Sequence, residues 1–157
     1  MISIKKIKLP IAGMDALHAE ARHEGYRFID ALLDEWATTK NRFDSPGEIL
    51  CGHLDQGLLV AVGGLNQDPF VGDPTIGRIR RVYVRSAWRN KGIGRALVTT
   101  LLEHARVSFR CVRLRTENDD AAGLYERIGF STIDDPHATH ILKFEAPFPT
   151  SRNDAST

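Results

Sequence analysis

The sequence predicts a mixed α/β domain, and three observations carry this prediction. Short apolar runs typical of strands alternate along the chain with segments whose apolar residues recur at helical spacing. The chain has 157 residues, which is an ordinary size for one domain with its own hydrophobic core. No internal repeat or linker divides it. We therefore expect one domain over residues 1–146 and a polar, flexible C-terminal tail over residues 147–157.

The N-terminal part of the chain is expected to form one strand and two helices. Isoleucine and lysine residues over 2–7 are typical of a short edge strand, which Pro10 ends. Apolar residues at helical spacing then predict a helix over 14–23 and a second helix over 26–37.

A hairpin follows these helices. Pro46 and Gly47 mark a turn, after which two apolar runs at 49–54 and 58–65 are separated by a short polar connection. The next segment, 66–77, contains proline and glycine residues and is predicted to be a loop.

The second half alternates between strands and helices. Strands are predicted at 78–84, 111–116 and 140–144 from their apolar and β-branched residues. Helices are predicted at 92–107, where Leu97, Val98, Leu101 and Leu102 share a face, and at 119–127.

Composition limits the classes of function. The formal net charge is +1, and acidic and basic residues are interspersed, so no global field attracts nucleic acid or an anionic membrane. Cys51 and Cys111 lie far apart in apolar segments, which is typical of buried thiols in a reducing compartment. No apolar run reaches the length of a membrane span. We expect a cytoplasmic protein.

The most informative segment is WRNKGIGRALV, over residues 88–98. Gly92 and Gly94 let the backbone turn tightly and bring N–H groups close to a phosphate, and the positive end of the following helix dipole favours an anion. Arg89, Lys91 and Arg95 add cationic side chains. The spacing matches neither the Walker A pattern nor the dinucleotide fingerprint. It predicts a site for a ligand that carries a polyphosphate.

A second motif about thirty residues later identifies a family. The pair RVYVRSAWRNKGIGRALV (residues 81–98) and ENDDAAGLYERIGF (residues 117–130) closely resembles the two core motifs of the GCN5-related N-acetyltransferases (GNAT). The resemblance extends over most of residues 2–145. It implies a central, mostly antiparallel sheet that is splayed at the fourth strand and flanked by about four helices. It also implies acetyl-CoA as the acyl donor, with no metal.

The resemblance assigns acetyl-CoA binding to the fourth strand, to the glycine loop and to one asparagine. The pantetheine arm would pair with the strand backbone in the splay, and the pyrophosphate would lie on the loop. The residues assigned in this way are Val82, Tyr83, Val84, Arg89, Asn90, Lys91, Gly92, Ile93, Gly94, Arg95 and Asn118.

Tyr125 matches the tyrosine that lies near the thioester sulfur in this family. Attack of an amine on a thioester creates an oxyanion, which N–H groups of the unpaired strand at Tyr83 or Val84 could stabilise. The departing thiolate needs a proton, and a phenol can donate it. We therefore predict Tyr125 as the general acid. Its apolar neighbours alone would also fit a core aromatic residue.

The general base stays open. Some relatives carry a glutamate where this chain has Arg113. Glu117, His140, Asp68 and bulk water are alternatives.

Three other sets of residues allow a structural and a functional interpretation: the arginines, a histidine pair and one cysteine. The arginines are expected to pair with acidic neighbours or be solvated, while Arg113 or Arg115 could instead select an acceptor with a carboxylate or phosphate. The arginines concerned are Arg78, Arg80, Arg81, Arg85, Arg110, Arg113 and Arg115. The pair His137 and His140 lacks the further ligands that a metal site needs. Cys111 lacks a base that would make it an acyl-carrying nucleophile.

The predicted function is direct transfer of an acetyl group from acetyl-CoA to a primary amine of a small molecule, peptide or protein. The helices at 14–23 and 26–37 and the loop 66–77 would form the acceptor side, with Trp36, Phe43 and Phe70 as candidate pocket residues. One alternative is a non-catalytic module that binds acyl-CoA. Another is a toxin-like acetyltransferase that acts on charged tRNA, which the near-neutral charge disfavours. A homodimer is compatible with the family.

Overall fold

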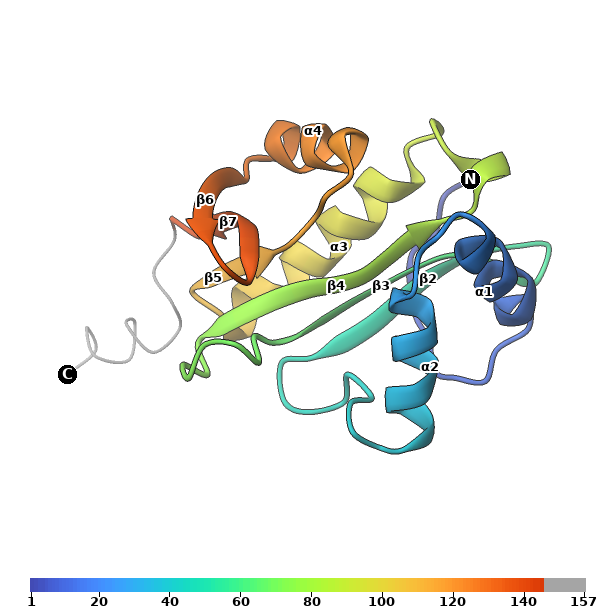
Figure 1. Cartoon of the computed structure of the whole chain (residues 1–157), viewed down its shortest axis with the longest axis horizontal. Helices are drawn as coiled ribbons and strands as arrows, with labels where there is room; N and C mark the ends of the chain where they lie inside the picture. The colour runs from blue at the N-terminus through green and yellow to red at the C-terminus, as the bar shows by residue number, and fades with distance from the viewer. Residues whose placement is uncertain (146–157) are drawn as a thin grey trace.

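The computed structural model describes residues 1–145, so the predicted tail over 147–157 lies outside the described residues. Those residues form a single seven-stranded sheet flanked by four α-helices (Figure 1). The predicted mixed α/β class is therefore confirmed. The strands are β1 (Lys5–Lys6), β2 (Ile49–Asp55), β3 (Leu58–Gln67), β4 (Ile76–Val84), β5 (Cys111–Leu114), β6 (Ser131–Asp135) and β7 (Ala138–Lys143). The helices are α1 (Met14–His23), α2 (Phe28–Ala37), α3 (Ile93–Ser108) and α4 (Asp119–Ile128), and a 3₁₀ turn covers Ser86–Trp88.

The sheet is antiparallel except at one junction. The strand order is β1-β2-β3-β4-β5-β7-β6, and only β4 and β5 run parallel. Their pairing covers Ile76 to Arg78 on β4, whereas β4 itself continues to Val84. From Ile79 onward β4 therefore keeps β3 on one side, and no strand within residues 1–145 pairs with it on the other. This is the splay at the fourth strand that the family resemblance implied.

Helices cover both faces of the sheet, and each face has its own apolar core (Figure 1). On one face, α3 and α4 pack through residues that include Leu97, Leu101 and Tyr125. On the other face, α1 and α2 pack through residues that include Leu17, Ile29 and Leu32. The leucines and Ile29 named here are fully buried, as the helical spacing of apolar residues predicts.

A bulge interrupts β4 in its middle. Val62 of β3 lies opposite Tyr83, but Gly64 lies opposite Arg80, so β4 carries one extra residue between these pairs. Arg81 adopts a left-handed conformation there, with φ of 62°. A bulge re-aims the side chains around it, and here it lets both Arg80 and Arg81 face α2 and its following loop.

Several predicted boundaries were wrong. The first strand is only Lys5–Lys6, α2 begins at Phe28 rather than at 26, and β4 begins at Ile76, which shortens the predicted loop 66–77. β5 ends at Leu114, before the predicted end at 116, and α3 is shifted by one residue relative to 92–107.

The prediction missed β6 and placed β7 two residues too late. β6 has the sequence STIDD, in which polar residues outnumber apolar ones. It forms because it pairs with β7 at the edge of the sheet. Charged residues are common on such edge strands, so no local apolar pattern marks this strand.

Candidate functional site

The free edge of β4 leads directly into the glycine loop. Val84 ends the strand, the 3₁₀ turn follows, and Asn90 and Gly92 both adopt left-handed conformations, with φ of 62° and 86°. Gly92 is the N-cap of α3, and no side chain caps this helix. The first N–H groups of α3 are therefore available to a ligand, and the first turn holds no acidic residue that would repel an anion.

The loop, the strand end and α4 meet at Gly94. A side-chain carbon built at Gly94 would lie 3.5 Å from a methyl group of Leu124 and 3.8 Å from one of Val84. The predicted phosphate loop, the predicted pantetheine strand and the helix that carries Tyr125 therefore lie side by side. Segments that are far apart in the sequence form one location, which fits a ligand that is long and carries phosphate at one end.

The cations predicted around the loop differ in their partners. Lys91 and Arg95 are exposed. Arg89 instead forms an ion pair with Glu24, with Nη2 2.6 Å from Oε1, and its Nε donates to the carbonyl oxygen of Val84 at 2.8 Å. Arg89 would have to leave these partners before it could contact a phosphate. Its assignment to acetyl-CoA binding stays a prediction.

Asn118 and Tyr125 lie on α4. Asn118 is the N-cap of the helix: its Oδ1 accepts from the N–H of Ala121, and its Nδ2 donates to the hydroxyl of Tyr26 at 3.1 Å. Tyr125 is 6% exposed and packs edge-on against Phe130. Burial raises the pKa of the Tyr125 phenol to about 12, so the group is protonated at neutral pH.

The structure adds a cluster of carboxylates that the sequence analysis did not single out. The hydroxyl of Tyr83 lies 2.7 Å from Oε2 of Glu20 and 2.5 Å from Oε1 of Glu24. Burial and then these two carboxylates raise the pKa of Tyr83 above its ordinary value. Arg85 and the N–H of Ser86 bind Glu20 as well. The cluster fastens α1 to the end of β4, next to the splay.

Most of the arginines pair with carboxylates, as the structural interpretation predicted. The pairs are Arg78–Asp68, Arg81–Glu35, Arg85–Glu20, Arg110–Asp73, Arg113–Asp68, Arg113–Asp135 and Arg115–Glu117. Asp68 is fully buried between Arg78 and Arg113. Nε of Arg113 lies 3.2 Å from Asp68 without the alignment of a hydrogen bond, so this contact is an ion pair only. Arg113 and Arg115 are thus held by partners, which weighs against their selecting an acceptor.

The candidate bases are held by partners too. Glu117 pairs with Arg115 and is highly exposed. Nε2 of His140 lies 2.9 Å from Glu126, and its Nδ1 lies 2.8 Å from the hydroxyl of Thr139. Asp68 accepts a hydrogen bond from Arg78 and forms an ion pair with Arg113. Nothing in these contacts favours one of the three as the base.

A polar cavity of about 430 Å³ lies beside the β4 bulge. We call it the Arg80 pocket. It is lined by the end of α2, the loop to β2, residues at the end of β3 and Arg80: Glu35, Thr39, Lys40, Asn41, Arg42, Asp44, Ser45, Glu48, Asn66, Pro69, Phe70 and Arg80. The end of α2 and the residues from Asn66 to Phe70 belong to the predicted acceptor side, whereas the loop between α2 and β2 was not part of that prediction. Of the three aromatic residues expected in a pocket, Phe70 lines this one, whereas Phe43 is buried in the core.

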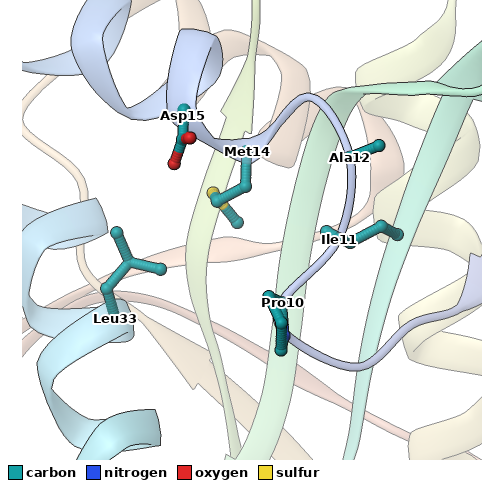
Figure 2. A pocket seen from close by; sticks show the side chains of 6 residues that line it. All are labelled: Pro10, Ile11, Ala12, Met14, Asp15 and Leu33. Carbon is teal, nitrogen blue, oxygen red and sulfur yellow. The ribbon is translucent and has the colours of Figure 1, made fainter.

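A second hollow, of about 390 Å³, is mostly apolar. Figure 2 shows Pro10, Ile11 and Ala12 on the segment before α1, Met14 and Asp15 at the start of α1, and Leu33 of α2 around the same space. It lies between the start of α1 and α2, two helices of the predicted acceptor side, and none of the residues predicted to bind acetyl-CoA or to catalyse transfer lines it. We assign it no role.

Other candidates have structural surroundings. The ring of His137 stacks on Phe70 at 4.3 Å, and Cys51 and Cys111 are free, buried thiols whose pKa values burial raises. Within residues 1–145, no three His, Cys, Asp or Glu side chains gather as a metal site would require. Across the same residues, no helix combines the length and hydropathy needed to cross a bilayer.

Sequence reasoning missed Glu20, Glu24 and Tyr26 as site residues, and it grouped Arg80 with the paired arginines. One sequence pattern was available: Glu20 and Glu24 are four residues apart, so both can face the same neighbour. The sequence holds no pattern that distinguishes Arg80 from Arg78.

Comparisons with known proteins agree with this geometry. The model of the acetyltransferase (GNAT) family matches residues 13–130. N-alpha-acetyltransferase RimI of Mycobacterium tuberculosis is 30% identical over 106 residues, which cover 64% of this chain and 64% of that protein. A crystal structure from Exiguobacterium sp. 255-15 has the same fold, with a TM-score of 0.82 at 24% identity over 100% of this chain and 99% of the other. A GCN5-related N-acetyltransferase from Kribbella flavida gives a TM-score of 0.68 at 18% identity, over 89% of this chain and 95% of that one.

The family model covers well over half of the chain. Membership supports acyl-CoA-dependent N-acetyltransferase activity in general and leaves the acceptor open. The splayed fourth strand, the uncapped glycine loop and the matched family motifs lead to one conclusion: the chain belongs to the acetyltransferase (GNAT) family.

Proposed function

We propose that this protein transfers the acetyl group of acetyl-CoA directly to a primary amine of a small molecule or peptide, within a ternary complex. The observation that carries the proposal is the unpaired edge of β4 after Arg78, which ends beside an uncapped helix N-terminus. A free strand edge can hydrogen-bond the two amides of a pantetheine arm. The helix N-terminus and the cations Lys91 and Arg95 can hold the pyrophosphate at its far end.

The N–H groups of the free edge would also serve the reaction. The amine nitrogen forms a bond to the thioester carbon, and the carbonyl oxygen gains negative charge. A backbone N–H of Tyr83 or Val84 that points into the splay would stabilise this oxyanion. The C–S bond then breaks, and its electron pair stays on sulfur.

Tyr125 would supply the proton that the departing sulfur needs. Its phenol is protonated at neutral pH because burial raises its pKa to about 12. The same burial makes this phenol a weaker acid. Desolvation also raises the pKa of a thiol, so the phenol can donate efficiently if the departing thiolate is desolvated too. The amine loses its extra proton to water, since no candidate base in the described residues is free of partners.

Release of free CoA thiol in the presence of a broad panel of amines tests this proposal. We expect release that depends on an amine, and we expect Tyr125→Phe to lower kcat by about 10²- to 10⁴-fold, the usual contribution of a general acid. The KM for acetyl-CoA should change little, because the phenylalanine keeps the packing against Phe130. A melting curve of the variant checks the fold.

The other outcomes are informative. An unchanged kcat in Tyr125→Phe would make Tyr125 a core aromatic residue only. Tight acetyl-CoA binding with no release for any amine or peptide would favour the non-catalytic module. Acceptor activity confined to aminoacyl-tRNA, with a steep dependence on salt, would support the alternative that acts on charged tRNA.

A further inference from the structure

The Arg80 pocket holds polar groups that lack partners. Oδ1 of Asn66 and Nδ2 of Asn41 are both buried without a hydrogen bond in the described part of the chain. Both residues line this pocket, and Asn66 is 7% exposed. A buried polar group without a partner typically costs about 1–3 kcal/mol. Two such groups around one cavity indicate that the cavity is built for a polar occupant.

Arg80 is the charged member of this group. Within residues 1–145 it makes no ion pair, whereas its neighbours Arg78 and Arg81 each have one. The nearby carboxylates that favour its charge are Glu35 and Asp68, and both are already bound to other arginines. Burial, followed by repulsion from Arg81, lowers the pKa of Arg80 to about 10. At neutral pH the guanidinium therefore remains charged and lacks a counterion.

The pocket lies next to the place where transfer is proposed. Arg80 forms one side of the β4 bulge, two residues before Val82, where the predicted pantetheine edge begins. Its side chain points to the face that α2 and the loop to β2 cover, and α2 is part of the predicted acceptor side. An acceptor whose amine reaches the bulge can therefore place a second group in the pocket.

The charges around the cavity determine what that second group is. Of the lining carboxylates, Glu35 is paired with Arg81, Glu48 accepts from the N–H groups of Ser45 and Gln67, and Asp44 is exposed and makes no ion pair within residues 1–145. The cations Lys40 and Arg42 line the cavity as well. Among the described residues, Arg80 and Nδ2 of Asn41 lack an acceptor, and the unpaired guanidinium favours one that carries negative charge, whereas Oδ1 of Asn66 lacks a donor. A carboxylate fits the planar guanidinium with two parallel hydrogen bonds. A polyamine would instead bring a second cation to an unpaired arginine.

We propose that the Arg80 pocket binds an anionic group of the acceptor, so that the substrates are amines that also carry a carboxylate or a phosphonate, such as amino acids. This inference rests on the proposed acetyltransferase function. Arg80 would be a specificity residue: it makes no contact with the reacting atoms and selects acceptors by charge.

The main test compares matched acceptors. Free α-amino acids and their carboxamides share the amine and the side chain but differ in the anionic group. We expect wild-type kcat/KM to favour the acid by about 10- to 100-fold, the usual worth of a charged hydrogen bond. Arg80→Gln should reduce that ratio to near one. The acid and the carboxamide differ in the basicity of their amines, and this difference affects both enzymes equally. It therefore cancels when the acid-to-carboxamide ratio of the wild type is divided by that of Arg80→Gln.

Arg110→Gln is the matched control, because Arg110 is an exposed arginine that pairs with Asp73, and neither residue lines the pocket. It should keep the wild-type preference. Two further comparisons show which anionic group the pocket accepts. Aminophosphonates test a phosphonate in place of the carboxylate, and peptides with N-terminal Glu or Gln test a side-chain carboxylate. A ratio near one in the wild type, or an Arg80→Gln variant that loses both substrates equally, would overturn the proposal. A raised KM for acetyl-CoA in Arg80→Gln would assign this arginine to the donor instead.

A binding measurement keeps this test separate from catalysis. At fixed ionic strength, acetate and inorganic phosphate should raise the Tm of the wild type by more than that of Arg80→Gln. Equal shifts in the two proteins would reject the anion site even if acetyl transfer occurs. Unequal shifts without any turnover would retain the site and reject the proposed function.

Discussion

Arg78 and Arg80 are two residues apart on β4, and both face the side of the sheet that α2 and its following loop cover, yet their surroundings differ. Nη1 of Arg78 lies 3.3 Å from Oδ2 of the fully buried Asp68, and its Nη2 donates to the carbonyl oxygen of His137 at 2.7 Å. Arg80 has no such partner in the described residues and lines a cavity beside two unpartnered asparagine groups.

This difference separates two uses of a charge on the inner face of the sheet, since Arg78 is buried and Arg80 is half-buried. Around Arg78, the partners are part of the chain, so the charge is neutralised on folding and supports the native structure. Around Arg80, the partner is missing, so the folded chain bears the free-energy cost of partly desolvating this charge until a ligand supplies a counterion. Binding sites often carry such a cost, which appears as lost stability.

Removing the shared carboxylate should give the largest effect. Asp68→Asn leaves Arg78 and Arg113 buried without their common counterion, and we expect the free energy of unfolding to fall by about 3–5 kcal/mol. Denaturant unfolding measures this loss. Asp73→Asn, which breaks only the exposed pair with Arg110, should have a much smaller effect. Similar losses in the two variants would show that Asp68 is not the centre of a buried network.

Replacing each arginine with methionine should shift stability in opposite directions. Arg78→Met removes a paired cation, and we expect a loss of about 2 kcal/mol because hydrogen bonds to Asp68 and His137 disappear. Arg80→Met removes an unpaired cation, and we expect a gain of about 1 kcal/mol because its desolvation cost disappears. Paired unfolding curves check both. A loss of stability in Arg80→Met would mean that the arginine has a partner in solution.

The smallest effect concerns the charges at the end of the same strand. Arg89 is the main cause of the lowered pKa of Glu24. Burial alone would raise the pKa of Glu20, but hydrogen bonds from Tyr83, Ser86 and Arg85 outweigh it and lower the value. A lowered pKa in the folded state means stability that is present above about pH 4.5 and is lost as the pH falls through the folded values.

Measuring unfolding from pH 7 to pH 3 should show this loss. The wild type should exceed the double variant Glu20→Gln, Glu24→Gln by about 1 kcal/mol at pH 7, since these pairs are partly exposed. The difference should vanish near pH 3. A constant difference across the range would assign the effect to packing rather than to charge.

The sequence predicted some parts of the molecule well, because their pattern is local. The apolar spacing of Leu97 and Leu101 predicted α3, and the glycines around its start predicted an open helix N-terminus. The prediction failed where pairing across the sheet determines structure. β6 exists because β7 lies beside it, and its five residues show no apolar alternation.

The candidate site divides in the same way. Adjacent residues such as Asn90, Gly92 and Gly94 form the loop, so their spacing alone indicated an anion site. The two partners of Arg78 lie 10 and 59 positions away in the sequence, and the partner of Arg81 lies 46 positions away, so no local pattern predicts them.

By itself, the sequence determined the family, the class of fold, the loop at the start of α3 and the candidacy of Tyr125, because each of these depends on residues close together in the chain. The tertiary structure alone decided which arginines are neutralised, that Glu20 and Glu24 bind Tyr83, and that Arg80 faces an open polar cavity. The physical reason is that a buried charge is stabilised or left unpaired by whatever the fold brings within a few ångströms of it. That distance depends on the bulge in β4 and on the packing of α2.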